Sequence, residues 1–520
     1  MKLPEFNGKT YFENTINKNS EVVTIKDVPE KSFYDSLGFF EAEGYQRWEL
    51  RESSTTAFCS LKKETNGVFI NYYYGTSELT VVQETDSKYF DYCDVMGAET
   101  VAPQITQVHL EDFGMSYVVR LSDGRFILFD GGRQFEPDAE SLYRCLKRGT
   151  NEEKPRIAAW IMTHPHSDHF HCFFAFMQAY AEDVVIEKFL FTFPEHDDNV
   201  HYPAVHSKST RLPYDTSIYA NIPRMLSVIE TTGAEIYAPH TGQRYVIGDA
   251  VCDILASIDD TIHCSTNVNA TSLVIRMQLG GQVILWAADA PFSDIKLSEK
   301  YGEYLKSDIL QVPHHGFQSG KAEAEIRAYR LIRPEVCLLP VSDYNAYTVF
   351  CTYRPSTRFL MQDAGVLEMI TGDEERPLTL PYTARPEGKA LLQRKLLTGL
   401  NATGSRAWIF TDLESANPED FMFTLLNTTH SPITVWVELF FENRESNLRY
   451  IKVELDPRTM KKICIIGDEV DADAVYYNWM SLKENGVPED ATFAVRFLCD
   501  TPIVVSHKNH APTYYSTYSV

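Results

Sequence analysis

The sequence predicts a mixed α+β protein of several domains, and three observations lead to this prediction. The chain has 520 residues, which suggests two to four domains. Hydrophobic residues make up 44% of it, which is enough to build large buried cores. Helix-like and strand-like segments alternate through most of the chain, whereas residues 385–520 contain a series of short strand-like segments.

Residues 1–95 are expected to form a small α+β domain. In the segment 31–44, Phe33, Leu37 and Phe40 are spaced at i, i+4 and i+7, which predicts a helix. Strand-like segments follow at 56–62, 68–74 and 79–84. The dipeptide Asn66-Gly67 predicts a hairpin turn between the first two. No catalytic motif is evident in this part of the sequence.

A segment with metal-binding character, IAAWIMTHPHSDHFH, occupies residues 157–171. It begins with six apolar residues, which predict a buried strand. Imidazole and carboxylate groups are ligands for zinc and other first-row metals. Four of them follow the apolar residues in a short run: His164, His166, Asp168 and His169. Pro165 keeps the backbone extended, so the first two imidazoles point to the same side. Ser167 is the expected N-cap of a buried helix over 170–180.

Polar motifs also follow three other strand-like segments. Asp130-Gly131-Gly132 ends the segment 125–129, and Asp289 follows the apolar segment 282–287. The segment 308–312 ends in Pro313-His314-His315-Gly316. A carboxylate at the end of a buried strand is costly unless it is paired or bound to a metal. These motifs therefore extend the predicted metal site.

Two of these motifs carry a family resemblance. The pattern His164-x-His166-x-Asp168-His169 resembles the signature of the metallo-β-lactamase-fold hydrolases. A strand followed by Pro-His-His-Gly is similar to the ComEC-type branch, the hydrolase domain of bacterial DNA-uptake proteins, near which the phosphorylcholine esterases belong. The resemblance covers residues 104–382 and implies an αββα sandwich at 96–384, between the small N-terminal domain and a C-terminal one.

The resemblance implies a site for two divalent metal ions, with zinc expected and manganese or iron as alternatives. His164, His166 and Asp289 would hold one ion. Asp168, His169, Asp289 and either His314 or His315 would hold the other. His314, which lies nearer the strand end, is the preferred ligand, and His315 is expected to contact the substrate or to orient ligands. Asp130 is expected to orient ligands as well.

The sequence departs from the family pattern at three places. Ala288 stands where glycine is usual before the bridging aspartate, which affects the tightness of the turn. Arg354 stands where the branch often has histidine, and it is expected to clamp an anion at the catalytic site. A further histidine ligand between the first motif and Asp289 is not evident, as in many ComEC-type relatives. The candidates for this ligand are His196, His201, His240 and, closest in order to the expected place, His263.

Residues 385–520 are expected to form a β-sandwich, because short alternating strands recur there at regular spacing. The predicted strands cover 407–411, 421–426, 434–442, 448–455, 461–466, 492–498 and 502–506. No catalytic constellation is evident among them. This domain is the expected place for any oligomer contact.

Charge and cysteine content limit the partners and the compartment. The formal net charge of −24 argues against binding nucleic acid or an anionic membrane. The ten cysteines are scattered without a CxxC pair, which favours reduced thiols. The sequence has no apolar run long enough to span a bilayer and no evident leader. We therefore expect a cytoplasmic protein.

Together these features favour a hydrolase in which a metal-activated hydroxide attacks a phosphoester, and a small or glycan-linked phosphodiester rather than DNA. The catalytic residues are expected to be Asp168, His315 and Arg354, with Asp168 orienting the hydroxide or moving its proton. One alternative is hydrolysis of a lactone or thioester. Another is a metal-containing binding or assembly protein without turnover, in which the loop 194–216 or a flanking domain blocks the site.

Overall fold

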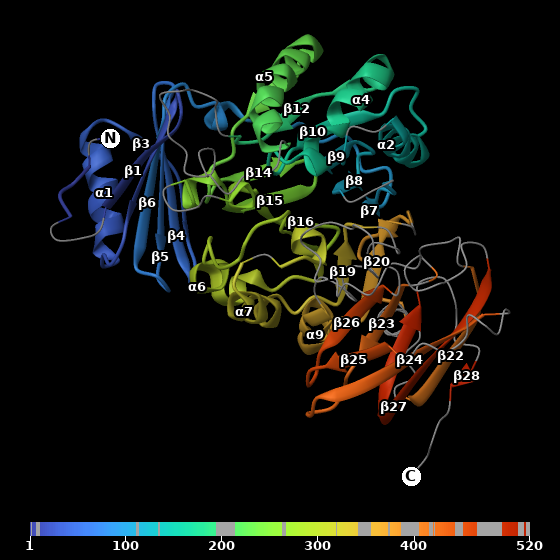
Figure 1. Cartoon of the computed structure of the whole chain (residues 1–520). Coiled ribbons are helices and arrows are strands. Elements are labelled where there is room, and N and C mark those ends of the chain that lie inside the picture. The colour runs from blue at the N-terminus through green and yellow to red at the C-terminus, as the bar shows by residue number, and fades with distance from the viewer. Residues whose placement is uncertain are drawn as a thin grey trace. The chain divides into compact units, whose positions relative to one another are not determined.

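The computed structural model of the chain (Figure 1) describes residues 1, 3–6, 11–110, 114–133, 136–193, 214–262, 267–318, 320–341, 355–372, 375–385, 405–414, 420, 422–441, 451–464, 491–507 and 514–515. The chain divides into two compact units: Met1–Ala346 with Phe359–Lys389, and Tyr347–Arg358 with Ala390–Val520. Helices and sheets are both present, so the prediction of a mixed α+β chain is confirmed. No helix in the described part has the length and hydrophobicity to cross a membrane.

The first sheet has six antiparallel strands in the order β1-β2-β6-β5-β4-β3. They are β1 (Tyr11–Asn17), β2 (Ser20–Ile25), β3 (Gln46–Glu52), β4 (Thr56–Lys63), β5 (Asn66–Tyr73) and β6 (Glu78–Glu84). Helix α1 (Lys31–Ala42) covers one face and buries Phe33, Leu37 and Phe40, as its spacing predicts. Strands β1, β2 and β3 are additions to the three strands that the sequence predicts.

The β4–β5 hairpin forms, but its turn lies two residues earlier than predicted. Lys63 pairs with Asn66, so the loop consists of Glu64 and Thr65. Glu64 takes the left-handed conformation that the turn needs, with a φ of 55°. Gly67 instead allows the ring of Phe90 to pack closely against the strand, because a Cβ atom at this position would lie 2.8 Å from that ring.

Two further sheets pack face to face. One has the order β13-β12-β10-β9-β8-β7-β21, with β11 beside β10, and the other has the order β14-β15-β16-β17-β18-β19-β20. The strands of the first are β7 (Gln104–Gln107), β8 (Ser116–Arg120), β9 (Phe126–Asp130), β10 (Arg156–Ile161), β11 (Val185–Ile186), β12 (Lys188–Leu190), β13 (Glu235–Tyr237) and β21 (Leu378–Thr379). Those of the second are β14 (Arg244–Ile247), β15 (Ala250–Ala256), β16 (Val274–Leu279), β17 (Gln282–Trp286), β18 (Ile309–Gln311), β19 (Val336–Leu339) and β20 (Glu368–Thr371). Phe129 and Trp286 stack at 4.1 Å within the shared core.

Helices cover the outer faces of these two sheets (Figure 1). Helices α2 (Glu136–Gly149), α4 (Cys172–Tyr180) and α5 (Tyr214–Thr232) pack on the first through a cluster that includes Trp160 and Phe173. On the second, Leu285 and Leu310 point away from the shared core and are nevertheless buried. Helices on that side are α6 (Leu297–Tyr301), α7 (Ala322–Ile332) and α9 (Pro355–Ala364).

The six-stranded sheet is joined to the following part of the chain by a shared core. On its face away from α1, Phe58, Phe69 and Phe90 contact Ile258 and Ile262. Ile258 begins the 3-10 helix η3 (Ile258–Asp260), which Ser257 caps with a capping box. Buried ion pairs reinforce the contact, as when Lys300 bonds both Asp260 and Glu78. The N-terminal sheet therefore holds the segment around η3 in place.

His240 makes this contact sensitive to pH. Its buried ring stacks on Phe69 and pairs with Asp259 (3.1 Å) and Glu84 (3.5 Å). Burial alone would lower the pKa of His240, but the two carboxylates outweigh it and raise the pKa to about 10. The stabilising contribution of the imidazolium is therefore complete below its unfolded pKa of roughly 6.5 and is lost as pH rises through the folded pKa.

As the pH is raised from 6.5 to 10, we expect the thermal midpoint of the wild type to decrease. The decrease should be larger than that of His240→Gln, which has no imidazole to titrate. Differential scanning calorimetry of both proteins across this range measures the difference. Parallel pH curves for the two proteins would contradict the assignment.

The second unit consists of antiparallel strands connected through one long strand, β27 (Thr492–His507). Its first part pairs with β22 (Ser405–Glu414) and β24 (Ile433–Phe441), and its last part pairs with β23 (Met422–Leu426). The remaining strands are β25 (Ile451–Leu455), β26 (Met460–Cys464) and β28 (Tyr514–Tyr515). Two separate strands were predicted where β27 runs without a break. The buried side chains form one core around Trp408, Phe410 and Phe497.

Candidate metal centre

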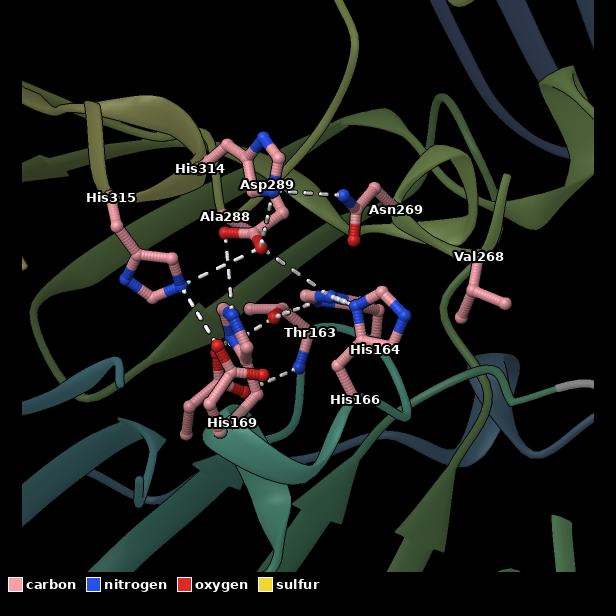
Figure 2. Close-up of polar contacts among 12 residues, drawn as sticks. Thr163, His164, His166, His169, Val268, Asn269, Ala288, Asp289, His314 and His315 are labelled. Carbon is pink, nitrogen blue, oxygen red and sulfur yellow. Dashed lines mark hydrogen bonds and ion pairs between the residues drawn. The ribbon is translucent and has the colours of Figure 1, made fainter. Parts of the chain in front are cut away.

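The polar motifs converge at the carboxyl ends of parallel strands (Figure 2). Strands β9 and β10 are parallel, and they deliver Asp130 and the histidine run of residues 164–169. Strands β17 and β18 are also parallel, and they deliver Asp289 and His315. Because the two sheets face each other, four strand ends from distant parts of the sequence meet at one place.

The first group of candidate ligands consists of His164, His166 and Asp289, whose ligand atoms lie within 4.8 Å of one another. His164 Nε2 lies 3.0 Å from His166 Nδ1 and 3.8 Å from Asp289 Oδ2. The backbone at His166 is extended, with φ −78° and ψ 148°. The two imidazoles therefore share one side of the chain, as the i, i+2 spacing predicts.

The second group consists of Asp168, His169 and His315, again within 4.8 Å of one another. His315 Nε2 lies 3.2 Å from Asp168 Oδ2 and 3.6 Å from Asp289 Oδ2. His169 Nε2 lies 3.3 Å from Asp289 Oδ1. The carboxylate of Asp289 thus stands between the two groups and can serve both.

The preference for His314 over His315 as a ligand does not agree with this geometry. His315 is buried and belongs to the second group. The His314 ring is 30% exposed, and its Nε2 atom lies 4.0 Å from Asp289 Oδ2 and 3.3 Å from Asn269 Nδ2. The reason is local. Both residues adopt left-handed backbone conformations, with φ of 49° and 52°, so the chain turns sharply after β18 and directs the second imidazole inward.

Hydrogen bonds fix the orientation of the candidate ligands. His169 Nδ1 donates to Asp130 Oδ2 at 2.7 Å, and the amide and hydroxyl of Thr163 donate to the same carboxylate at 2.7 Å each. His315 Nδ1 donates to the carbonyl of Pro340 at 3.1 Å. In each ring the other nitrogen, Nε2, is left to face the site. Asp130 thus takes the orienting position expected for it.

The candidate ligands differ in their protonation states. Burial and the neighbouring His169 and His166 rings lower the pKa of His164 well below its usual value, which keeps this imidazole neutral. Burial alone would raise the pKa of Asp168, but a hydrogen bond from His315 and the charge of His169 hold it well below the usual range. His164 and Asp168 are therefore in the forms that bind metals. Burial alone would lower the pKa of His169 and of His315, but Asp289 and the further carboxylates of Asp130 and Asp168 raise both, so these two imidazoles must release a proton when a metal binds.

The residues present fit two divalent ions. Four imidazole nitrogens and two carboxylates form a nitrogen–oxygen donor set of the kind that zinc, manganese and iron accept. The individual distances of 3.0–3.8 Å between ligand atoms also agree, since ligands at about 2.0–2.2 Å from one ion lie within roughly 4 Å of each other. The metal's identity does not follow from this donor set.

Several other predicted residues lie elsewhere or outside the described residues. Arg354, His196, His201 and His263 lie outside them, as does most of the loop 194–216. His240 pairs with Asp259 and Glu84 and belongs to neither ligand group. Ser167 is the first residue of α3 (Ser167–Phe170), and the predicted cap position falls to His166.

Ala288 adopts the left-handed conformation that glycine would take more easily, with a φ of 46°. Such a backbone costs roughly 1–2 kcal/mol for a residue with a Cβ atom. Gln311 Oε1 offsets the strain by accepting hydrogen bonds from the amides of Ala287 (2.9 Å) and Ala288 (2.6 Å). The turn before Asp289 is therefore tight despite the missing glycine.

Two residues near the ligands were not predicted from the sequence. Thr163 connects Asp130 to the histidine run, and Asn269 lies beside His314 (Figure 2). Thr163 directly precedes the run, and its position was the only available signal. Asn269 comes 20 residues before Asp289 in a segment without metal-binding character, so its spacing gives no signal.

Residues 110–249 match the family model of the metallo-beta-lactamase superfamily. The chain contains a metallo-beta-lactamase superfamily domain. The matched range includes Asp130 and the histidine run but ends before Asp289 and His315, which the structure adds to the same site. The ComEC-type branch remains a prediction.

Solved structures give weak similarity. The flavodiiron protein from Giardia intestinalis is 11% identical, with 58% of this chain and 61% of that chain covered and a TM-score of 0.24. The Anabaena sensory rhodopsin transducer is 18% identical over 20% of this chain and 95% of its own, with a TM-score of 0.15. Thermotoga maritima 1070 is 15% identical over 23% and 100%, with a TM-score of 0.16. A comparison with curated proteins found no match.

Substitution of Asp130 by asparagine is expected to weaken metal binding about 10- to 100-fold, the usual effect of removing a group that orients a ligand. An amide cannot accept hydrogen bonds at both of its heavy atoms, so it fails to serve His169 and both groups of Thr163. Competition with a chromophoric chelator measures the affinity, and circular dichroism checks the fold. Unchanged affinity in a folded Asp130→Asn variant would contradict the orienting role.

Proposed function

We propose that this protein is a metal-dependent hydrolase that cleaves small or carbohydrate-linked phosphodiesters. One observation carries the proposal: the Asp289 carboxylate lies within 3.3–3.8 Å of nitrogen atoms from both ligand groups. The two ligand groups would hold two divalent ions on either side of this carboxylate, and such a pair would supply the charge stabilisation that displacement at phosphorus needs.

Divalent metals bound at these positions would polarise the ester and make water acidic enough to react near neutral pH. The protein's own residues orient the ligands and accept protons. Asp130 and the carbonyl of Pro340 hold His169 and His315 in single orientations. Among the candidate carboxylates, Asp168 is 20% exposed and Asp289 only 2%. Asp168 is thus the carboxylate best placed to accept a proton from an attacking water.

Positive charge near His171, three residues after Asp168, supports an anionic substrate. His171 follows the histidine run, and burial together with the guanidinium groups of Arg224 and Arg133 lowers its pKa to about 4, against the opposing effect of Asp168. Arg224 is exposed and stacks on Phe174 at 4.1 Å. Arg354 is retained in the proposal as a further anion clamp. The net charge of −24 favours a small anion over a long nucleic acid.

The test combines metal analysis with an assay on bis-p-nitrophenyl phosphate. Protein purified without chelator is expected to carry close to two metals per chain and to hydrolyse the diester, while Asp168→Ala loses more than about 100-fold in activity because both a ligand and a proton acceptor are removed. Two bound metals without diester hydrolysis would contradict the phosphodiesterase proposal, and turnover of a lactone or thioester would then identify the carbonyl alternative. A chain that binds no zinc or manganese would contradict the metal centre itself.

A further inference from the structure

We propose that Asn269 provides its amide oxygen as a protein ligand to the metal position formed by His164, His166 and Asp289. The inference rests on the proposed metal centre but does not depend on which substrate is cleaved. Asn269 belongs to the 3-10 helix η4 (Val268–Thr271), which precedes β16. No metal-binding pattern in the sequence includes this residue.

The two candidate metal positions differ in their supply of ligands. The second has Asp168, His169 and His315, with Asp289 in addition. Within the part of the chain that the structure describes, the first has only His164, His166 and Asp289 among the histidines, cysteines and carboxylates. A divalent first-row ion at the first position thus has room for another protein donor.

The side chain of Asn269 lies at this position (Figure 2). It is 7% exposed, and its Nδ2 atom is 3.3 Å from His314 Nε2. Figure 2 shows the amide oxygen on the side of the site where His164 and His166 lie. Considering the described residues, this oxygen is buried and has no hydrogen-bond partner. Since a buried acceptor without a partner costs free energy, a bound ion or its water is expected there.

The orientation of the amide follows from the His314 ring. His314 Nδ1 lies 3.0 Å from the carbonyl of Gln318, which can only accept, so Nδ1 carries the proton in the neutral ring. Nε2 is then an acceptor and requires a donor, and the NH2 group of Asn269 is that donor. The amide oxygen must point the other way, into the site. His314 thus orients the Asn269 amide.

The backbone around Asn269 is anchored on two sides. The Asn267 side chain accepts a hydrogen bond from the backbone N–H of Asn269 at 3.0 Å. Thr261 Oγ1 donates to the backbone carbonyl of Ala270 at 2.7 Å. Leu273 N donates to the carbonyl of Thr163, the residue before the histidine run, at 3.0 Å. The preceding η3 segment packs under the N-terminal sheet. Asn269 is therefore held at a fixed place relative to His164.

An amide oxygen has a chemical consequence for metal selection. Carbonyl oxygens suit harder ions such as manganese, whereas imidazole suits zinc. The proposed position has two imidazoles, a carboxylate and an amide, and it can be compared with one in which a third imidazole replaces the amide. The preference for zinc over manganese should therefore be smaller at the position with the amide.

The test is titration of the metal-free protein with Co(II), Mn(II) and Zn(II), by chelator competition and by the visible absorption of the Co(II) form, which reports the ligand set. Asn269→Ala is expected to weaken one of the two positions at least about tenfold and to change the Co(II) spectrum. Asn269→Asp is expected to keep both positions filled, and Asn269→His to strengthen zinc relative to manganese. The matched control is Asn267→Ala, which removes the cap of the same turn and leaves the amide ligand.

Unchanged affinities and an unchanged Co(II) spectrum in Asn269→Ala would overturn the proposal, even if hydrolysis fell. An equal loss of metal in Asn267→Ala would also overturn it, because the effect would then come from the turn. A wild type that fills two positions without hydrolysing the phosphodiester leaves this inference standing and removes only the proposed substrate.

Discussion

Replacement of Asp289 by alanine is expected to empty both metal positions and to abolish hydrolysis. Its carboxylate lies between the two ligand groups, 3.8 Å from His164 Nε2, 3.3 Å from His169 Nε2 and 3.6 Å from His315 Nε2. Without it, the first group keeps only the imidazoles of His164 and His166 among the described histidines, cysteines and carboxylates. The two metal positions also lose the one negative charge that they share. We expect a loss of metal affinity above about 100-fold at each position, since groups that only orient ligands already cost 10- to 100-fold.

Elemental analysis of Asp289→Ala after dialysis, together with chelator competition, measures this effect. Asp294→Ala is the matched control, because Asp294 lies in the same loop but is exposed, and among the contacts described its side chain accepts a hydrogen bond only from Ser293. The control should keep both metals. Retention of two metals by Asp289→Ala would show that the carboxylate does not bridge.

Replacement of Lys300 by methionine is expected to cause the largest loss of stability outside the metal centre. Lys300 is 2% exposed, bonds Asp260 and lies 3.4 Å from Glu78, and both carboxylates are buried. Its ammonium also lies 4.3 Å from the centre of the Tyr73 ring. The neutral side chain leaves two buried carboxylates without their shared cation, which costs about 3–5 kcal/mol.

The same cluster provides a control for this prediction. Lys296 also pairs with Glu78, at 2.7 Å, but is 37% exposed, so its replacement by methionine should cost less than about 1 kcal/mol. Calorimetric melting of both variants gives the comparison. Equal shifts for the two variants would mean that the Lys300 ion pairs do not stabilise the contact between the N-terminal sheet and η3.

Local patterns in the sequence were enough to find most of the candidate ligands. The histidine run follows an apolar strand, and the i, i+2 spacing of His164 and His166 needs only an extended backbone to act. Helix α1 was predicted in the same way from the spacing of Phe33, Leu37 and Phe40. In each case the decisive interaction is between residues close in sequence.

Features that depend on tertiary structure could not be predicted. Choosing between His314 and His315 requires the left-handed turn after β18, and neither residue type indicates that conformation. Strand β3 was missed because it is a largely exposed edge strand without apolar alternation. Asn269 acquires its place only when Leu273, two residues after η4, is hydrogen-bonded to Thr163, more than 100 residues earlier in the chain. Long-range packing decides all three.

The pairing of β7 with β21 has a consequence for how this protein could have been assembled. Ile105 pairs with Leu378 and Gln104 with Thr379, so the polypeptide enters and leaves this pair of sheets at one edge. Segments whose ends lie together can be inserted into other chains or receive neighbours without rearranging their interior. Chain ends that meet at one edge allow sequence to be joined to this pair of sheets outside the ligand strands β9, β10, β17 and β18, and the N-terminal sheet is joined in this way through its own shared core with η3.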